Sequence, residues 1–373
     1  MAEKTDIHLV ENRRQLSEFI RFPWKIYRAD RYWVPPLIGE QKRLFTPEKN
    51  PFYGHAEVAL FLAERVGETV GRIAAIVNRA HNEFYGDKTG FFGFFESIDD
   101  KDVSGRLFEA AGEWLRQKGM DCMRGPMNFS TNEACGLLVE GFDSSPVIMM
   151  TYNPAYYIRL VEGNGFYKAK DLLAFWLGTS QPIPERVLKI AQKVSQEHKV
   201  CLRTLNMKRF DEEVERIKLI YNQAWSRNWG FVPMSDEEFY QTAKDLKRIA
   251  VPELALLAEI EGEPAAFSVT IPDLNQALKK IDGRLDPISL VKLLWYSRKV
   301  TQLRLMLLGI RAGYRRRGID SLLYTETFKA AKRLGYIGGE ISWILEDNTL
   351  IIRGIETMGG RLYKRYRIYD KRL

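Results

Sequence analysis

A seven-residue segment occurs twice in the chain, and this repeat constrains the fold more than any other feature. Residues 62–68 are LAERVGE and residues 257–263 are LAEIEGE. In each copy, apolar residues lead into a glycine and further apolar residues follow, a pattern typical of two strands joined by a tight turn. Two shorter matches follow in the same order: FxAA at residues 108 and 328, and Tyr-Lys at residues 167 and 363. Three matches in one order predict a single domain plan used twice.

The length of the chain agrees with two such domains. Its 373 residues, 45% of them hydrophobic, are enough for two cores of ordinary size. Residues 178–184 contain two prolines and a glycine, and this stretch is the natural linker. We therefore expect an N-terminal domain over residues 1–177 and a C-terminal domain over residues 178–373.

The second half of the chain predicts a mixed α/β fold. Ser235 and Glu238 form the pattern of a capping box at the start of a helix. The helix expected at 319–334 follows an apolar strand and ends at Gly335, so a helix crosses over after a central strand. The expected elements are strands at 200–205, 303–310 and 339–345 and helices at 210–225, 236–249 and 319–334.

Composition narrows the setting of the protein. No apolar run reaches 18 residues and the first fourteen residues include no apolar segment, which predicts a cytoplasmic protein without a spanning helix. The net charge of +8 favours an anionic partner but is too small to indicate nucleic acid. No metal site is expected, because the histidines have no metal-ligand spacing. They are His8, His55, His81 and His198.

The turn at residues 311–320, RAGYRRRGID, carries the clearest sign of function. It lies between the expected strand 303–310 and the expected helix 319–334. A glycine-containing loop that leads into a helix presents free backbone N–H groups and the positive end of the helix dipole, which suits a pyrophosphate. The neighbouring arginines could bind further phosphate oxygens.

This junction resembles that of the GCN5-related N-acyltransferases (GNAT), which have the pattern Q/R-x-x-G-x-G/A there. Arg315 and Gly318 match it, and Asn348 followed by Gly359 resembles the second signature of the family. The resemblance implies two tandem GNAT-like domains and acetyl-CoA or another acyl-CoA as co-substrate, with no metal. Carried over, the residues that bind the pantetheine arm and the phosphates are Leu308, Ile310, Arg315, Arg316, Arg317, Gly318, Ile319 and Asn348.

Two positions depart from the family pattern. Asp320 stands where the family has Gly or Ala, and Ile355 stands where a general-acid tyrosine is frequent. The proton donor would then be another residue, for which Tyr363 and Tyr366 are candidates. For the general base the candidates are Glu340, Glu346 and Asp347, on or after the strand 339–345.

The first copy differs at the corresponding junction. After its apolar strand 90–95 the chain continues ESIDDKD, which is acidic where phosphates would bind. We therefore expect the N-terminal domain to be a degenerate copy without a coenzyme loop. Its amides and aromatics, Tyr152 and Asn153 among them, suit the wall of an acceptor pocket, and Trp229 lies in the helix-to-helix turn of the second copy where the family often binds the acceptor.

These features make an acyl-CoA-dependent N-acyltransferase the leading hypothesis. Within it, we expect the transfer of an acetyl group to an unidentified amine. One alternative is a non-catalytic acyl-CoA-binding or regulatory protein that kept the fold, which Asp320 and Ile355 favour. Another alternative is an enzyme that uses aminoacyl-tRNA, because the superfamily includes duplicated members of this kind. The sequence has no series of aromatic residues for base stacking that would indicate nucleic acid. Transfer to a lipid-linked amine is the fourth possibility, because Arg- and Tyr-rich edges can rest on an anionic membrane surface.

Overall fold

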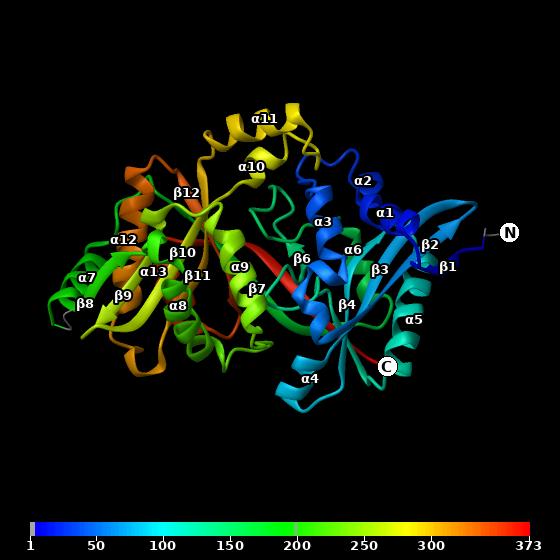
Figure 1. Ribbon diagram of the computed structural model, residues 1–373, viewed down its shortest axis with the longest axis horizontal. Helices are drawn as coiled ribbons and strands as arrows, with labels where there is room; N and C mark the ends of the chain where they lie inside the picture. The colour runs from blue at the N-terminus through cyan, green and yellow to red at the C-terminus, as the bar shows by residue number, and fades with distance from the viewer. Residues whose placement is uncertain (1–3, 198–199) are drawn as a thin grey trace. The chain divides into compact units, whose positions relative to one another are not determined.

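The computed structural model describes residues 4–197 and 200–373, so His198 lies outside the described part (Figure 1). The fold is mixed α/β, as expected. The chain forms two compact units. Unit 1 contains the chain up to Leu172 together with Asn275–Tyr296 and Lys364–Leu373, and unit 2 contains Leu173–Leu274 and Ser297–Tyr363.

Unit 1 is built on antiparallel strands with one parallel pair. Strands β1 to β4 are joined in order by antiparallel ladders, and β5 then pairs with β4 in parallel. Helix α5 buries Val103, Leu107 and Leu115 against this sheet, at the spacing of one helix face. The elements are β1 (Asp6–Leu9), α1 (Arg13–Arg21), α2 (Pro23–Ile26), α3 (Ile38–Leu44), β2 (Ala56–Arg65), β3 (Glu68–Asn78), α4 (Arg79–Tyr85), β4 (Thr89–Ser97), α5 (Lys101–Gln117), β5 (Cys122–Gly125), β6 (Leu137–Glu140), α6 (Tyr156–Glu162), α10 (Asn275–Leu278) and α11 (Pro287–Ser297).

Unit 2 repeats this plan. Strands β8 to β11 are joined by antiparallel ladders, and β12 pairs with β11 in parallel. Helix α12 buries Ile319, Leu322 and Leu323 against the sheet and against α7. Its elements are α7 (Glu185–Glu197), β8 (Val200–Thr204), α8 (Phe210–Trp225), α9 (Asp236–Lys247), β9 (Ala255–Ile260), β10 (Glu263–Pro272), β11 (Gln302–Ile310), α12 (Ile319–Arg333), β12 (Gly338–Leu345) and α13 (Thr349–Thr357). Two further strands, β7 (Tyr167–Gly178) and β13 (Arg361–Arg372), are divided between the units.

The repeated segment forms the same hairpin in both units. The turn between β2 and β3 and the turn between β9 and β10 each have two consecutive residues with positive φ, Val66–Gly67 and Glu261–Gly262. Such turns match the twist of the strands they join. The predicted capping box of Ser235 and Glu238 is confirmed at the start of α9. All six elements expected in the second half are present within two residues of their expected ends.

The units divide differently from the expected boundary between residues 177 and 178. The division falls between Leu172 and Leu173, inside β7, so that the later part of β7 belongs to unit 2 and adjoins β12. In return, β13 begins in unit 2 and continues from Lys364 in unit 1, where it pairs with β5 and β6. Each unit thus contains the end of the other copy's last strand. A sequence repeat gives the order of elements and carries no information on which sheet a terminal strand joins.

A short segment from the second half also belongs to unit 1. Asn275–Tyr296 lies between β10 and β11 in sequence, yet Asn275 donates to the carbonyl of Pro146 at 2.9 Å. The carbonyl of Gly283 accepts from Ile38 N at 2.9 Å. Within residues 4–197 and 200–373, no helix has the length and apolarity needed to cross a bilayer.

We expect His81 in α4 to make the stability of unit 1 depend on pH. Its side chain is buried, and burial lowers the pKa of the imidazole from 6.5 to about 4, partly opposed by Asp87 at 3.6 Å. Between pH 6.5 and about 4, the imidazole of His81 is protonated in the unfolded chain and neutral in the folded chain. We therefore expect the free energy of unfolding to fall by about 3 kcal/mol as the pH drops from 6.5 to 4.

Urea unfolding at a series of pH values measures this loss. The His81→Phe variant removes the titrating group and keeps the ring contacts with Tyr85 and Phe91, so its stability curve should be flatter over this window. The control is Tyr85→Phe, which keeps a ring beside His81 and leaves the imidazole in place, so its slope should match that of the wild type. An equal slope in His81→Phe and the wild type would show that other groups cause the pH dependence.

Candidate active site

In unit 2 the parallel strands β11 and β12 separate part-way along their length. Their ladder runs from Gln302, opposite Gly338, to Leu305, opposite Ile341, and ends there. At the same point β11 bulges against β10, because Met306 is an extra residue between Leu305 and Leu307. The result is a fork between the two strands, in which one backbone edge of β11 from Met306 onward has no partner in the β11–β12 ladder.

The side chains of this part of β11 have their own packing. Leu308 and Ile310 pack against the core that contains Ile319 of α12. Gly309 between them faces the other side of the sheet, where an added Cβ would lie 2.5 Å from the ring of Trp225. The backbone of β11, rather than the side chains of Leu308 and Ile310, is therefore the part that is open to a ligand at the fork.

Helix α12 begins beside the fork with an uncapped N-terminus. Gly318 is its N-cap residue in the left-handed conformation, with φ +78°, and within residues 4–197 and 200–373 no side chain caps the first turn. A Cβ at Gly318 would lie 2.9 Å from Val194 and 3.0 Å from Ile190 of α7, so both the conformation and the packing require glycine. Unsatisfied N–H groups at a helix start can bind an anion.

A cavity of about 600 Å³ lies at this helix start. Its charged lining is balanced, because Arg186 and Arg353 offset Asp320 and Glu356. Asp320, the residue that departs from the family pattern, is thus one of two carboxylates on the wall. The full lining comes from α7, α12 and α13: Arg186, Val187, Ile190, Asp320, Ser321, Tyr324, Arg353, Gly354, Glu356, Thr357 and Met358.

The three consecutive arginines of the loop are exposed but differ in their contacts. Arg315 donates to the carbonyl of Ala224 at 2.7 Å and to that of Ile310 at 3.3 Å, and so ties the end of α8 to the end of β11. Arg317 lies over the ring of Tyr314 at 5.2 Å. Arg316 has a left-handed φ of +62° and, among the described residues, takes part in no hydrogen bond or ion pair.

Two of the predicted catalytic residues lie in contact. Glu340 on β12 is fully buried, and its carboxylate accepts hydrogen bonds from Tyr363 and Ser342. Arg304 lies opposite Glu340 in the parallel ladder and donates to Ser342 Oγ at 3.3 Å. Tyr363 is half-buried and therefore links this carboxylate to a more accessible position.

The other predicted residues of this group lie elsewhere. Glu346 and Asp347 follow the end of β12, and Tyr366 belongs to unit 1. Asn348 is the N-cap residue of α13, as the second signature implies, although its side chain makes no capping bond. Ile355 is fully buried in the core of unit 2, so its position supplies no proton donor.

The sequence reasoning missed two polar residues of the fork. Trp343 follows the last paired residues of β12, and its buried Nε1 has no hydrogen-bond partner among the described residues. Arg304 is buried within the apolar strand β11, and its guanidinium lies 5.2 Å from the ring of Trp343. A single charged residue in a strand of apolar residues was the available signal for Arg304, and no pattern marked Trp343.

The corresponding fork in unit 1 is closed. Strands β4 and β5 pair only from Thr89 to Phe91, as in unit 2. Beyond that point Met127 N donates to the carbonyl of Phe92 at 2.7 Å, and Asn128 Oδ1 accepts from Phe94 N at 2.8 Å. In unit 1, other parts of the chain thus bind the backbone of β4 beyond the end of the β4–β5 ladder.

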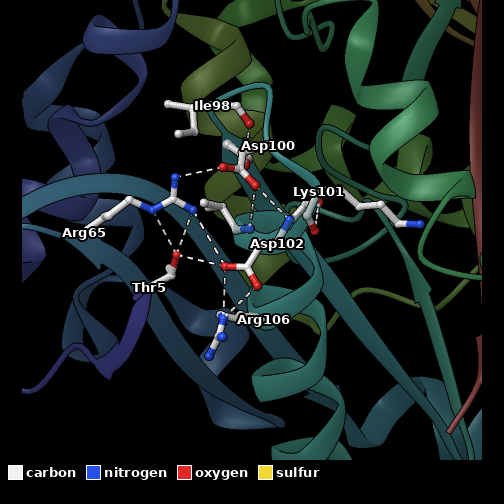
Figure 2. Close-up of polar contacts among 10 residues, drawn as sticks. Thr5, Arg65, Ile98, Asp100, Lys101, Asp102 and Arg106 are labelled. Carbon is white, nitrogen blue, oxygen red and sulfur yellow. Dashed lines mark hydrogen bonds and ion pairs between the residues drawn. The ribbon is translucent and has the colours of Figure 1, made fainter. Parts of the chain in front are cut away.

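The helix start in unit 1 is also taken by the chain's own groups, as Figure 2 shows. Asp100 caps α5 by accepting from Asp102 N at 2.8 Å and Val103 N at 3.3 Å. Arg65 donates to the other oxygen of Asp100 at 2.8 Å. A carboxylate with its own cationic partner therefore lies where unit 2 has an uncapped helix and a cavity.

The predicted acceptor residues are held by local contacts. Tyr152 donates to Asp30 at 2.9 Å. Asn153 is buried, and both hydrogens of its amide donate to backbone carbonyls, those of Leu138 and Pro154. Trp229 lies in the turn between α8 and α9 of unit 2, whereas the other two belong to unit 1.

Unit 1 also contains a buried charged cluster on β3 and β4 that the sequence did not reveal. Glu96 accepts from Tyr157 at 2.7 Å and from Tyr27 at 2.9 Å, and Arg72 lies 3.7 Å from it. Burial raises the pKa of Glu96, and Arg72 and the two tyrosines partly offset this. The described residues include no group of three or more His, Cys, Asp or Glu side chains that could hold a metal ion.

Comparison with known proteins identifies the family. No family model matches the chain. It is 38% identical over 371 residues to the bacterial ceramide synthase of Caulobacter vibrioides, covering 98% of this chain and 96% of the relative. It is 36% identical over 371 residues to Protein YghO of Escherichia coli, covering 97% and 94%. A tandem GNAT protein from the clavulanic acid biosynthesis pathway matches 99% of this chain and 98% of its own, with a TM-score of 0.60 at 12% identity.

The chain belongs to the family of these two relatives and has the fold of the tandem GCN5-related N-acyltransferases. In this tandem GNAT fold the two copies differ from each other in two features, the strand fork and the helix start. Both are open in unit 2, and both are filled by the chain in unit 1.

Proposed function

We propose that this protein transfers the acyl group of an acyl-coenzyme A to the primary amine of a long-chain lipid. The observation that carries the proposal is the open fork of β11 and β12 beside the uncapped start of α12, present in one copy only. A relative named ceramide synthase supports the acceptor class, because a ceramide is a long-chain amine carrying an N-acyl group.

The coenzyme would bind through backbone groups and two arginines. The first-turn N–H groups of α12 suit the pyrophosphate, and Arg316 and Arg317 are the accessible cations beside them. The open edge of β11 near Leu308 and Ile310 suits the amides of the pantetheine arm. Arg315 acts in this proposal as a positioning residue, since its guanidinium holds the carbonyls of Ala224 and Ile310. Unit 1 would bind no coenzyme, because Asp100 caps its helix.

The chemistry proposed for the fork is direct attack. The amine nitrogen forms a bond to the thioester carbonyl carbon, and the carbon–sulfur bond breaks. An ammonium substrate gives up two protons in all, one of which ends on the thiolate of coenzyme A and one in solvent. The ammonium loses its first proton to solvent. Tyr363 and Glu340 form the relay for the second: the phenol oxygen takes this proton from the nitrogen as the phenol gives its own proton to the carboxylate of Glu340, and the relay then returns a proton through Tyr363 to the thiolate. The buried Nε1 of Trp343, which has no hydrogen-bond partner in the described part of the chain, is a further donor near the fork.

Turnover with a panel of substrates tests the proposal. Purified protein is mixed with acyl-CoA of 2 to about 16 carbons and with short amines, long-chain amino alcohols or aminoacyl-tRNA, and both free thiol and amide product are measured. The proposal expects amide product with the long-chain amines. Coenzyme binding without thioester loss across the panel would favour the non-catalytic binding protein, and product with aminoacyl-tRNA alone would favour the tRNA-directed enzyme.

A pair of variants tests the relay. Replacing Glu340 by glutamine should lower kcat about 100-fold or more with little change in KM, the usual effect of losing a general base. The matched control is Glu346→Gln, which removes a carboxylate beyond the end of the same strand. Thermal unfolding of both variants separates a loss of folding from a loss of proton transfer. Equal kcat values for the two variants would remove Glu340 from the mechanism.

A further inference from the structure

Helix α11 is apolar on nearly every side, although only one narrow stripe of it packs on the protein. Its sequence is PISLVKLLWYS, with a single charged residue. Ser289 is buried, and Leu293 and Tyr296 are half-buried, which places the packed stripe at a spacing of four and three residues. The helix belongs to the segment Asn275–Tyr296 of unit 1 (yellow in Figure 1).

The rest of α11 exposes large apolar side chains. Ile288 is 70% exposed, Val291 67%, Leu294 59% and Trp295 57%. Leu290 is exposed on the same helix, and Leu285 just before it. A helix that is apolar all round is normally covered, and a contiguous exposed apolar surface of this kind marks an interaction site. We call this surface the α11 patch.

Basic residues flank the α11 patch along the chain and outnumber the two carboxylates of the same segment. Lys280, Arg284 and Lys292 are exposed on the segment, and Arg298 and Lys299 follow the helix directly. Of the two acids, Asp282 accepts from Trp24 Nε1 at 2.9 Å. Asp286 caps α11 by accepting from Ile288 N at 3.1 Å and Ser289 N at 3.0 Å. The surface offered to a partner is therefore apolar with a positive border.

We propose that the α11 patch docks this protein on the surface of an anionic lipid bilayer, with α11 lying in the plane of the interface. A helix of 11 residues is too short to span a bilayer, whereas aliphatic residues and a tryptophan bordered by lysine and arginine are the composition of an interfacial helix. A second copy of the chain fits the patch less well, because its own positive border would face this one. The inference goes beyond acyl transfer and stands without it.

Sedimentation with lipid vesicles of phosphatidylcholine and phosphatidylglycerol tests the apolar part of the α11 patch. The triple variant Ile288→Gln, Val291→Gln, Leu294→Gln keeps the net charge, and we expect its vesicle partition coefficient to fall about 100-fold. The matched control replaces three exposed apolar residues outside the patch: Leu9→Gln, Val66→Gln and Leu219→Gln. This control should bind as the wild type does.

The basic border is tested separately. Substituting Lys280, Arg284 and Lys292 by glutamine should weaken binding to the anionic vesicles by about fivefold per residue and leave binding to pure phosphatidylcholine little changed. The emission of Trp295, isolated as the difference between wild type and Trp295→Phe, should shift to shorter wavelength on binding. All of these readouts are independent of enzyme activity.

Three results would overturn the proposal. The first is the absence of wild-type binding to anionic vesicles, and the second is equal binding by the patch variant and its control. The third is a lipid-free dimer that dissociates when Ile288, Val291 and Leu294 are replaced, because the α11 patch would then be covered by a second copy of the chain. Failure of acyl transfer would leave the docking proposal intact, and a failure of docking would leave the fork chemistry intact.

Discussion

Substituting Ser321 by glutamate should raise the dissociation constant of acyl-CoA at least about 100-fold. Ser321 lies in the first turn of α12 and lines the cavity there. In the proposed binding mode a carboxylate at this point faces the phosphates of the coenzyme, and two like charges about 4 Å apart repel by about 4 kcal/mol at an intermediate dielectric. The new carboxylate also competes for the first-turn N–H groups, as Asp100 does in unit 1.

Two companion variants separate charge from shape. Ser321→Gln has nearly the same volume as the glutamate variant without its charge, and its affinity should lie within a few-fold of the wild type. Asp320→Asn removes a carboxylate from the same wall, so its affinity should increase. Thermal-shift titration with free and acylated coenzyme A measures all three, and a ligand at 100 times its dissociation constant should add about 2.7 kcal/mol. Equal affinities for Ser321→Glu and Ser321→Gln would place the phosphates elsewhere.

Replacing Arg72 by methionine should lower the free energy of unfolding of unit 1 by about 3 to 5 kcal/mol, because it leaves the carboxylate of Glu96 buried without its cation. Arg72 also donates to the carbonyl of Phe19 at 2.6 Å, which anchors α1. The control is Arg79→Met, which breaks an exposed ion pair with Glu57 and should cost at most about 1 kcal/mol.

The pH dependence gives this prediction a second readout. The pKa of Glu96 is already raised by burial and should rise further without Arg72. A carboxyl group with a raised pKa binds its proton more tightly in the folded chain, so the loss in Arg72→Met should shrink as the pH falls and grow as it rises. Urea unfolding between pH 5 and about 8 measures this trend. Equal costs for Arg72→Met and Arg79→Met would show that the Glu96 cluster adds no stability.

The sequence predicted the features that depend on neighbouring residues. The helix start at Gly318, the capping box of Ser235 and the strand before the loop follow from local patterns, and all are present. The sequence also named both residues of the proposed relay, Glu340 and Tyr363, as candidates. It did not predict their contact, because that contact depends on where β13 begins relative to β12.

Other features depend on distant partners and left no pattern to find. The fork of β11 and β12 follows from where a ladder stops, and the closed fork of unit 1 follows from Met127 and Asn128, which come long after β4 in sequence. The cluster of Arg72 and Glu96 joins two strands with Tyr27 and Tyr157. Helix α11 escaped notice because its apolar residues resemble those of a core helix until their exposure is known.

The exchange of last strands has a consequence for the history of the chain. Once β7 contributes to unit 2 and β13 to unit 1, neither copy keeps a complete sheet when separated from the other. A gene that lost its first copy would therefore encode a protein lacking a strand of the copy that has the open fork. Unit 1 can thus lose the ability to bind a coenzyme and still be retained, since selection for a folded second copy preserves both copies.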